Sequence, residues 1–362
     1  MNILTLDAGG TNFIFSAICD NKINKITILK PANGNNLNLC LNTIIDGFKE
    51  IKNKLDKKID AISFAFPGPA DYKKGIIGDL FNLPAFRGGI ALSPMLEEIF
   101  QVPVFINNDG DLYAYGEALA GSLPMINKKL KDNNNSKQYN NLVGLTIGTG
   151  FGAGFVSEKH LIKGDNICAA EIWITSNRVN PEINSEEGVS IRAVKYFFSE
   201  LSNIPLGDCP EPKEIFEIGC NKKHINHFFA INAYEELGHF IGDTIANMIT
   251  LFDGIVVIGG GIAGAKDLII PGIKKELSTT FHKIGKVETN PRLIQDVFCL
   301  NNKQEFENFL EVRETTIKVP FSDKEIIYDP HPRCAFMFSD YETSDMINLG
   351  AYHFALEKLK NE

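Results

Sequence analysis

Two glycine-rich segments of this chain have the composition of phosphate-binding turns. The first, Leu4–Phe15, contains Asp7-Ala8-Gly9-Gly10-Thr11-Asn12, and the second, Leu145–Val156, contains Gly148-Thr149-Gly150. Each has an apolar run, a glycine turn with hydroxyls and a second apolar run, which predicts a β-hairpin whose turn leaves backbone N–H groups open. Such groups bind phosphate oxygens, and Asp7 can hold a divalent cation through water. The pair predicts two lobes that close on ATP and Mg²⁺.

A single turn of this kind is also an ordinary structural feature, because tight hairpins favour glycine and asparagine. What favours a duplicated binding device is the shared pattern, with Leu-Thr before each turn and phenylalanine after it. Neither copy has the Gly-x-x-x-x-Gly-Lys-Ser/Thr spacing of a P-loop. We therefore expect hairpin turns to hold the phosphate.

Asp109 is the candidate general base. It lies in Asn107-Asn108-Asp109-Gly110-Asp111, between a predicted strand and a predicted helix, where open α/β sheets place reactive groups. The same segment is also typical of an ordinary turn and helix N-cap. We expect Asp111 to cap the helix and Asp109 to remain available, ionised by the helix start.

A third glycine segment, Gly259-Gly260-Gly261-Ile262-Ala263-Gly264, follows the predicted strand 255–258. It satisfies the Gly-x-Gly-x-x-Gly pattern of dinucleotide-binding folds, and Glu288 lies near the spacing of a ribose-binding acid. An NAD-dependent dehydrogenase is therefore one alternative, although no clean strand ends at Glu288. In an ATP-dependent enzyme the same glycines would lie against adenosine.

The segments that must position these residues alternate between strand and helix patterns, which predicts an α/β fold. A first lobe over 1–117 is followed by a second lobe over 118–345, with the C-terminal helix, about 346–362, packing back on the first. Residues 127–141 are polar and of low complexity, which predicts a mobile loop between the lobes. The β-type runs at 315–319 and 325–328 indicate an inserted element over about 285–335. The predicted strands are 3–7, 13–19, 61–66, 102–106 and 255–258, and the predicted helices are 37–54, 111–121, 213–252, 266–276 and 346–360.

Composition bounds the class of protein. The chain has 362 residues, 44% of them hydrophobic, and a net charge of −9 with no basic block, which disfavours nucleic acid and anionic membranes as partners. It has no long apolar span and no leader pattern, so we expect a cytoplasmic protein. Seven scattered cysteines indicate reduced thiols. Cys220, His224 and His227 have a spacing that zinc ligands can have, but an exposed helix face is the more ordinary interpretation.

Six short motifs occur in the order seen in sugar kinases of the ROK (repressor, open reading frame, kinase) family, which the chain resembles over about 2–285 and 348–352. That family belongs to the actin/hexokinase/heat-shock-ATPase superfamily. The motifs are Asp7-Ala8-Gly9-Gly10-Thr11, Pro67-Gly68-Pro69, Asn82-Leu83-Pro84, Asn108-Asp109, Gly148-Thr149-Gly150-x-Gly152 and Phe252–Gly261.

The resemblance implies a two-lobed actin-like ATPase fold with ribonuclease H-like domains and an interlobe cleft. It also implies transfer of the γ-phosphoryl group of ATP to a hexose or N-acetylhexosamine hydroxyl, with Asp109 as base and Mg²⁺ held by Asp7 through water. The implied sugar-binding residues are Gly68, Asn82, Asn108, Asp109, Glu171 and Glu186 or its neighbour Glu187. The implied nucleotide-binding residues are Asp7, Gly9, Gly10, Thr11, Asn12, Gly148, Thr149, Gly150, Gly259, Gly260 and Gly261.

The chain departs from the family where the sugar is contacted. Many members have a zinc-binding histidine three residues after a glutamate, followed by a cysteine cluster, whereas this chain has Glu171-Ile172-Trp173-Ile174 and no such cluster. We therefore expect no structural zinc. Trp173 either packs against a sugar or, as the more ordinary role, fills a core gap. The usual lysine after Gly-Gly-Thr is replaced by Asn12.

Two further alternatives concern activity and assembly. The missing histidine is compatible with a sugar-binding sensor that has lost catalysis. Repressors of the family carry an N-terminal helix-turn-helix, and none precedes the first strand, so we do not expect DNA binding. A lid, a regulatory site or a homodimer contact are all compatible with the position of the 285–335 element.

Overall fold

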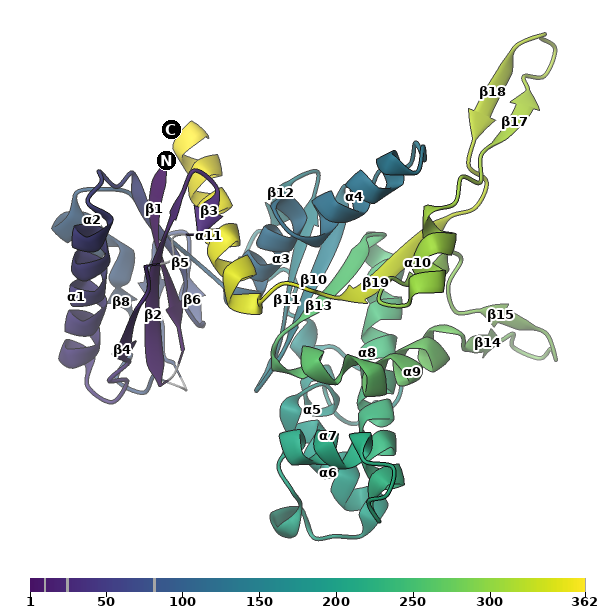
Figure 1. Ribbon diagram of the computed structural model, residues 1–362, viewed down its shortest axis with the longest axis horizontal. Coiled ribbons are helices and arrows are strands. Elements are labelled where there is room, and N and C mark those ends of the chain that lie inside the picture. Colours follow the sequence, from purple (N-terminus) through teal and green to yellow (C-terminus); the bar gives the residue numbers. More distant parts are fainter. Residues whose placement is uncertain (10, 24–25, 81–82, 362) are drawn as a thin grey trace. The chain divides into compact units, whose positions relative to one another are not determined.

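The computed structural model describes residues 1–9, 11–23, 26–80 and 83–361 (Figure 1). The chain forms two compact units. Unit 1 consists of Met1–Ser122, Ala153–Ala170 and Asp340–Glu362, and unit 2 consists of Leu123–Gly152 and Glu171–Ser339. The predicted division after residue 117 differs from this mainly in Ala153–Ala170, which belongs to unit 1.

Unit 1 is built on a sheet of order β3-β2-β1-β5-β9, with β4 also paired to β2. β1 and β2 form the antiparallel hairpin predicted at the first glycine turn, while β5 and β9 continue the sheet in parallel with β1. A small sheet, β6-β7-β8, follows β5 in the chain. The strands of unit 1 are β1 (Asn2–Ala8), β2 (Asn12–Cys19), β3 (Lys22–Ile23), β4 (Ile28–Pro31), β5 (Ala61–Ala65), β6 (Ala70–Asp71), β7 (Ile76–Ile77), β8 (Ile90–Ala91), β9 (Val104–Asn107) and β12 (His160–Ile162).

Helices cover both faces of this sheet (Figure 1). Side chains of a strand alternate between faces. Leu4 and Leu6 join the core beneath α1, whereas Ile3 joins the one beneath α11, which contains Tyr352. This alternation explains why the adjacent residues Ile3 and Leu4 are both buried. The helices of unit 1 are α1 (Leu37–Leu55), α2 (Leu92–Phe100), α3 (Asp109–Leu119) and α11 (Thr343–Asn361).

Unit 2 contains four parallel strands side by side, β10, β13, β19 and β16. The turn at Gly148–Gly150 lies between β10 and β11. Sequence patterns missed β16 and β19, which belong to this sheet rather than to an insertion. The strands are β10 (Asn141–Ile147), β13 (Ile255–Gly259), β16 (Asp296–Cys299) and β19 (Arg333–Phe338), with β11 (Phe151–Ser157) crossing the unit boundary.

Two secondary-structure predictions in unit 2 were wrong. The predicted helix 213–252 is interrupted between Cys220 and His227, so that α7 and α8 are separate. The predicted loop 127–141 begins instead with α4, which buries Leu123, Ile126 and Leu130. Those three residues have helical spacing that the surrounding lysines and asparagines obscured. The helices are α4 (Ser122–Asp132), α5 (Ser185–Gly188), α6 (Ile191–Ser202), α7 (Pro212–Cys220), α8 (His227–Phe252), α9 (Lys266–Leu277) and α10 (Lys303–Leu310).

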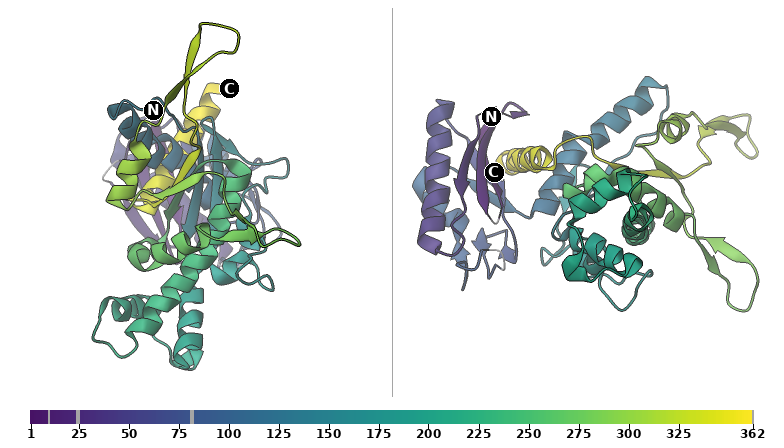
Figure 2. Two further views of the ribbon diagram at one scale, coloured as in Figure 1. Left: turned by 90° about the vertical axis from the view of Figure 1, so that its right-hand side faces the viewer. Right: turned by 60° about the horizontal axis from the view of Figure 1, so that its bottom comes forward.

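Two hairpins extend from the body of unit 2, as Figures 1 and 2 show. They are β14–β15 (Thr280–His282 and Thr289–Pro291) and β17–β18 (Thr315–Lys318 and Glu325–Tyr328). The β17–β18 hairpin confirms the two β-type runs predicted within 285–335.

None of the described helices combines the length and apolar composition that crossing a bilayer requires. All seven cysteines are free, as predicted for reduced thiols.

Helices α3 and α11 pack so closely that glycine is required at their crossing. A Cβ atom at Gly116 would lie 2.0 Å from the carbonyl oxygen of Met346, and one at Gly350 would lie 1.8 Å from that of Leu112. Both obstacles are backbone atoms, which cannot rotate away. The crossing therefore fixes α11 against the helix that begins with Asp109.

Gly350→Ala should lower the free energy of unfolding. Alanine gains about 1 kcal/mol of helix propensity over glycine, but overpacking costs about 1–3 kcal/mol, and a backbone obstacle puts this site at the upper end. We expect a net loss of about 2 kcal/mol, measured by chemical denaturation. Gly207→Ala is the control, since a Cβ atom there meets nothing within 4 Å. Equal stability of the two variants would contradict the packing argument.

Candidate active site

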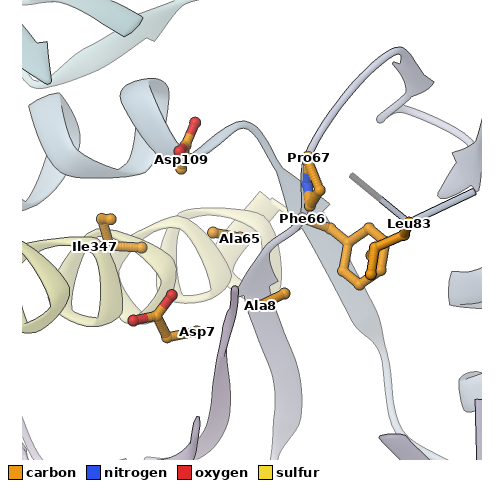
Figure 3. Close-up of a pocket in the computed structure, with 8 residues that line it drawn as sticks. All are labelled: Asp7, Ala8, Ala65, Phe66, Pro67, Leu83, Asp109 and Ile347. Atoms are coloured by element: carbon orange, nitrogen blue, oxygen red, sulfur yellow. The ribbon is translucent and has the colours of Figure 1, made fainter. Parts of the chain in front are cut away.

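Three parallel strands of unit 1 end at one pocket. β1 ends with Asp7 and Ala8, β5 is followed by Phe66 and Pro67, and β9 leads into Asp109 at the start of α3. Open α/β sheets bind ligands outside the carboxyl ends of their strands. Figure 3 shows the residues that line the pocket, which are Asp7, Ala8, Ala65, Phe66, Pro67, Leu83, Asp109 and Ile347.

Asn108, and not Asp111, caps α3. The Asn108 side chain accepts a hydrogen bond of 2.8 Å from the Gly110 N–H, whereas Asp111 lies buried within the first turn. The expectation for Asp111 was therefore wrong. Asp109 is the first residue of the helix, and its Oδ1 accepts a 2.9 Å hydrogen bond from the same N–H. Its other carboxylate oxygen remains available to the pocket.

Both pocket carboxyl groups have a raised pKa. Desolvation raises the pKa of Asp109, although the side chain keeps access to solvent, and backbone N–H groups of Gly110 and Asp109 offset part of that rise. Desolvation also raises the pKa of Asp7, and the negative charge of Asp109 raises it further. We expected the helix start to favour ionised Asp109. It does act in that direction, but loss of water outweighs it.

The first glycine turn is described only in part. A Cβ atom at Gly9 would lie 2.9 Å from the Asn12 carbonyl oxygen, so this position requires glycine. Thr11 and Asn12 are exposed beside it. Gly68 is exposed and follows the pocket residue Pro67. Gly10 and Asn82, predicted for the nucleotide and the sugar, lie outside the described residues.

In unit 2 the other two glycine segments lie at one edge of the sheet. β10 and β13 run parallel, with Thr146 opposite Gly259, so the segments that follow them emerge side by side. Gly260 has a φ of 94°, and a Cβ atom there would lie 2.2 Å from the carbonyl oxygen of Ile147. This approach brings Gly259–Gly261 next to the Gly148–Gly150 turn. Thr149 and Gly150 are exposed.

The predicted sugar ligands of unit 2 lie in two places. Glu186 accepts a 2.9 Å hydrogen bond from the Phe151 N–H, directly after the second glycine turn. Glu171 is exposed and accepts a hydrogen bond from the indole N–H of Trp173. Trp173 is 37% exposed, so the expectation that it fills the core was wrong. Ile174, at the family's histidine position, is 62% exposed.

The zinc-like spacing on α7 and α8 does not form a site. Within residues 1–9, 11–23, 26–80 and 83–361, no three His, Cys, Asp or Glu side chains are arranged to hold a metal ion. His224 and His227 contact backbone groups instead. Sequence reasoning also missed Ile347. It reaches the pocket from α11, more than 200 residues after Asp109 in the sequence, and no local signal could have indicated it.

Comparisons with known proteins agree with the motif pattern. The sequence profile of the ROK family matches residues 3–178. A crystal structure of glucokinase from Parabacteroides distasonis is 46% identical in sequence to this chain and has a TM-score of 0.88. The alignment covers 98% of this chain and 97% of that glucokinase. The chain belongs to the ROK family. The two-sheet α/β actin-like fold that the sequence predicted is confirmed by this match.

A more distant ROK protein shares the fold. A glucokinase from Streptomyces griseus in complex with glucose and AMPPNP is 17% identical, with a TM-score of 0.63 over 98% of this chain and 99% of that one. The xylose repressor of Bacillus spizizenii is 24% identical over 221 residues, which are 60% of this chain and 52% of that protein. The chain thus spans about half the length of that relative.

Asp109→Asn should stabilise the folded protein at neutral pH. Because the pKa of Asp109 is raised on folding, its ionisation destabilises the native state as pH rises from about 4, the unfolded value, through the raised value. Asparagine removes that charge and keeps an acceptor for the Gly110 N–H. The stability gain over wild type should therefore grow with pH and vanish near pH 4, as measured by urea unfolding.

The control for this measurement is Asp71→Asn. A hydrogen bond from the Lys74 N–H lowers the pKa of Asp71, so the sign of its pH dependence should be the opposite. A gain for Asp109→Asn that did not change between pH 4 and pH 8 would contradict the assignment.

Proposed function

We propose that this ROK protein transfers the γ-phosphoryl group of ATP to a hexose hydroxyl, with Asp109 as general base. The observation that carries the proposal is the pocket at the ends of β1, β5 and β9, which holds Asp7 and Asp109 together. Its polar side chains are carboxylates on rigid elements, as proton transfer and cation binding both require. The 46% identity to a glucokinase supports glucose as the first acceptor to test.

In this reaction Asp109 accepts a proton from the sugar hydroxyl. The hydroxyl oxygen bonds to the γ-phosphorus while the bond from that phosphorus to the β,γ-bridging oxygen breaks, and ADP leaves. A carboxylate with a raised pKa takes this proton more readily than an ordinary one, because it is the stronger base. The hydrogen bond from Gly110 fixes one Asp109 oxygen and thereby orients the other.

Asp7 fits the role of holding Mg²⁺ through water. Its carboxylate supplies the hard oxygen that this ion prefers, and a cation would offset the desolvation and the charge of Asp109, which together raise the pKa of Asp7. When bound, Mg²⁺ would neutralise charge on the phosphates of ATP. In unit 2 the Gly148 N–H donates to the Gly150 carbonyl oxygen, so the exposed Thr149 and Gly150 are the residues of this turn that would present N–H groups to phosphate. Gly259–Gly261 would present a surface without side chains to adenosine.

Hexose recognition would use groups that both donate and accept hydrogen bonds. The Oδ1 atom of Asn108 is engaged in capping α3, which leaves its Nδ2 to donate to a sugar oxygen. Gly68, Glu171 and Glu186 are the further described candidates. An N-acetylhexosamine is the second acceptor class to test. Ile174 stands where relatives have a histidine, so the hydrogen bond of that histidine must be replaced or lost.

Asp109→Asn should abolish phosphoryl transfer without preventing binding. General-base catalysis contributes about 10²–10⁴ in rate, so we expect kcat to fall about 10³-fold while KM changes little. Glucose-dependent ADP release provides the measurement, with mannose, fructose, N-acetylglucosamine and N-acetylmannosamine as further acceptors. Asp71→Asn is the matched control. Activity that survived in Asp109→Asn would exclude this base, and binding without turnover in wild type would favour a sensor.

MgATP, and not NAD, should raise the melting temperature of the protein. A ligand that binds only the folded state at 100 times its Kd stabilises that state by about 2.7 kcal/mol. That gain would appear as a shift of about 4 °C in a chain of 362 residues, given an unfolding entropy of about 2.1 cal/mol/K per residue. Differential scanning fluorimetry with each nucleotide makes the comparison. Protection by NAD alone would favour the dehydrogenase interpretation of Gly259–Gly264.

A further inference from the structure

The second glycine turn has an acidic side chain lying on its backbone. Oε2 of Glu186 accepts the Phe151 N–H at 2.9 Å, and a Cβ atom at Gly150 would lie 2.9 Å from the same oxygen. Glycine at this position therefore makes room for the carboxylate. An anion already occupies one of the N–H groups beside the turn.

The segment that carries Glu186 is fastened to the turn. The Ile191 N–H, at the start of α6, donates a 2.9 Å hydrogen bond to the Gly148 carbonyl oxygen. On the other side of Glu186, the Ser185 N–H donates a 2.9 Å hydrogen bond to the Thr175 carbonyl oxygen. Glu186 thus lies on a short helix that is hydrogen-bonded to neighbouring segments on both sides.

An arginine completes the arrangement. Nη2 of Arg192 lies 3.7 Å from Oε1 of Glu186 and 3.7 Å from Oε1 of Glu187, and the Arg192 side chain is 57% exposed. A backbone N–H and a guanidinium converging on one anion are the donors that proteins use for phosphate. Arg192 thus adds a positive charge beside the second turn.

We propose that the Glu186 carboxylate is a stand-in for a nucleotide phosphate. In the nucleotide-free protein it occupies the Phe151 N–H and pairs with Arg192; an entering phosphate displaces it and takes both donors. Two anions cannot share one N–H at hydrogen-bonding distance, so nucleotide binding must move Glu186. The inference rests on the proposed function, because it takes this turn as the phosphate site. Release of Glu186 would also free a carboxylate for the sugar network.

Glu186→Gln and Glu187→Gln form a matched pair that tests this. Each removes one negative charge, and each acid lies 3.7 Å from the same arginine nitrogen, but only Glu186 lies on the turn. Titration calorimetry with MgADP, without sugar, should show about tenfold tighter binding for Glu186→Gln, the scale of one charged hydrogen bond. Glu187→Gln should stay within about twofold of wild type.

A second pair tests the arginine. Arg192→Met should weaken MgADP binding at least fivefold. The control is Lys195→Met on the same helix as Arg192, which breaks an ion pair with Glu211 and should leave MgADP binding unchanged. Circular dichroism confirms folding of each variant. Equal affinities of the two glutamine variants, or an unchanged affinity of Arg192→Met, would overturn the inference and leave the proposed kinase intact. Failure of wild type and all variants to bind MgADP would overturn both, while absence of phosphoryl transfer alone would overturn only the kinase.

Discussion

The parallel alignment of β1, β5 and β9 is the constraint on which the pocket depends. Because the three strands run in the same direction, their carboxyl ends meet at one edge, and residues 7, 65–67 and 109 are brought together from distant parts of the chain. Placing two carboxylates at such an edge costs free energy, because desolvation raises the pKa of both groups and the charge of Asp109 raises that of Asp7 further. The surrounding structure must maintain this arrangement against that cost, as functional sites commonly require.

The two units use the same plan with different contents. In each unit, the glycine turn follows a strand that pairs with a parallel neighbour: β1 pairs with β5 in unit 1, and β10 pairs with β13 in unit 2. Unit 1 places carboxylates at the edge of its sheet, while unit 2 places glycines there, at Gly148–Gly150 and Gly259–Gly261. Acidic side chains suit cations and proton transfer, whereas bare backbone suits phosphate and a flat base. The sequence repeat is thus a shared scaffold for two kinds of chemistry.

Local patterns predicted what local forces determine. The strands of the first hairpin, the apolar β5 and the run at Glu325–Tyr328 follow from side-chain alternation and turn residues. The break between α7 and α8 and the capping of α3 by Asn108 were missed, because several adjacent polar residues competed for the same role. The pKa of Asp109 depends on desolvation by atoms remote in sequence, so no motif could have given its direction. Glu186 was chosen for a sugar, while its hydrogen bond to the turn requires the tertiary fold.

The crossing of α3 and α11 has a consequence for the order in which the protein is made. Residues 343–361 supply a face of the unit 1 core, yet all of unit 2 lies between them and the strands β1, β5 and β9 in the sequence. During synthesis, the face of β1, β5 and β9 that packs against α11 remains without that helix until residues 343–361 have been made. By then the complete sequence of unit 2 has already been synthesised. The side of unit 1 that α11 covers, including Ile347 at the pocket, therefore assembles only after the whole sequence of unit 2 has been synthesised.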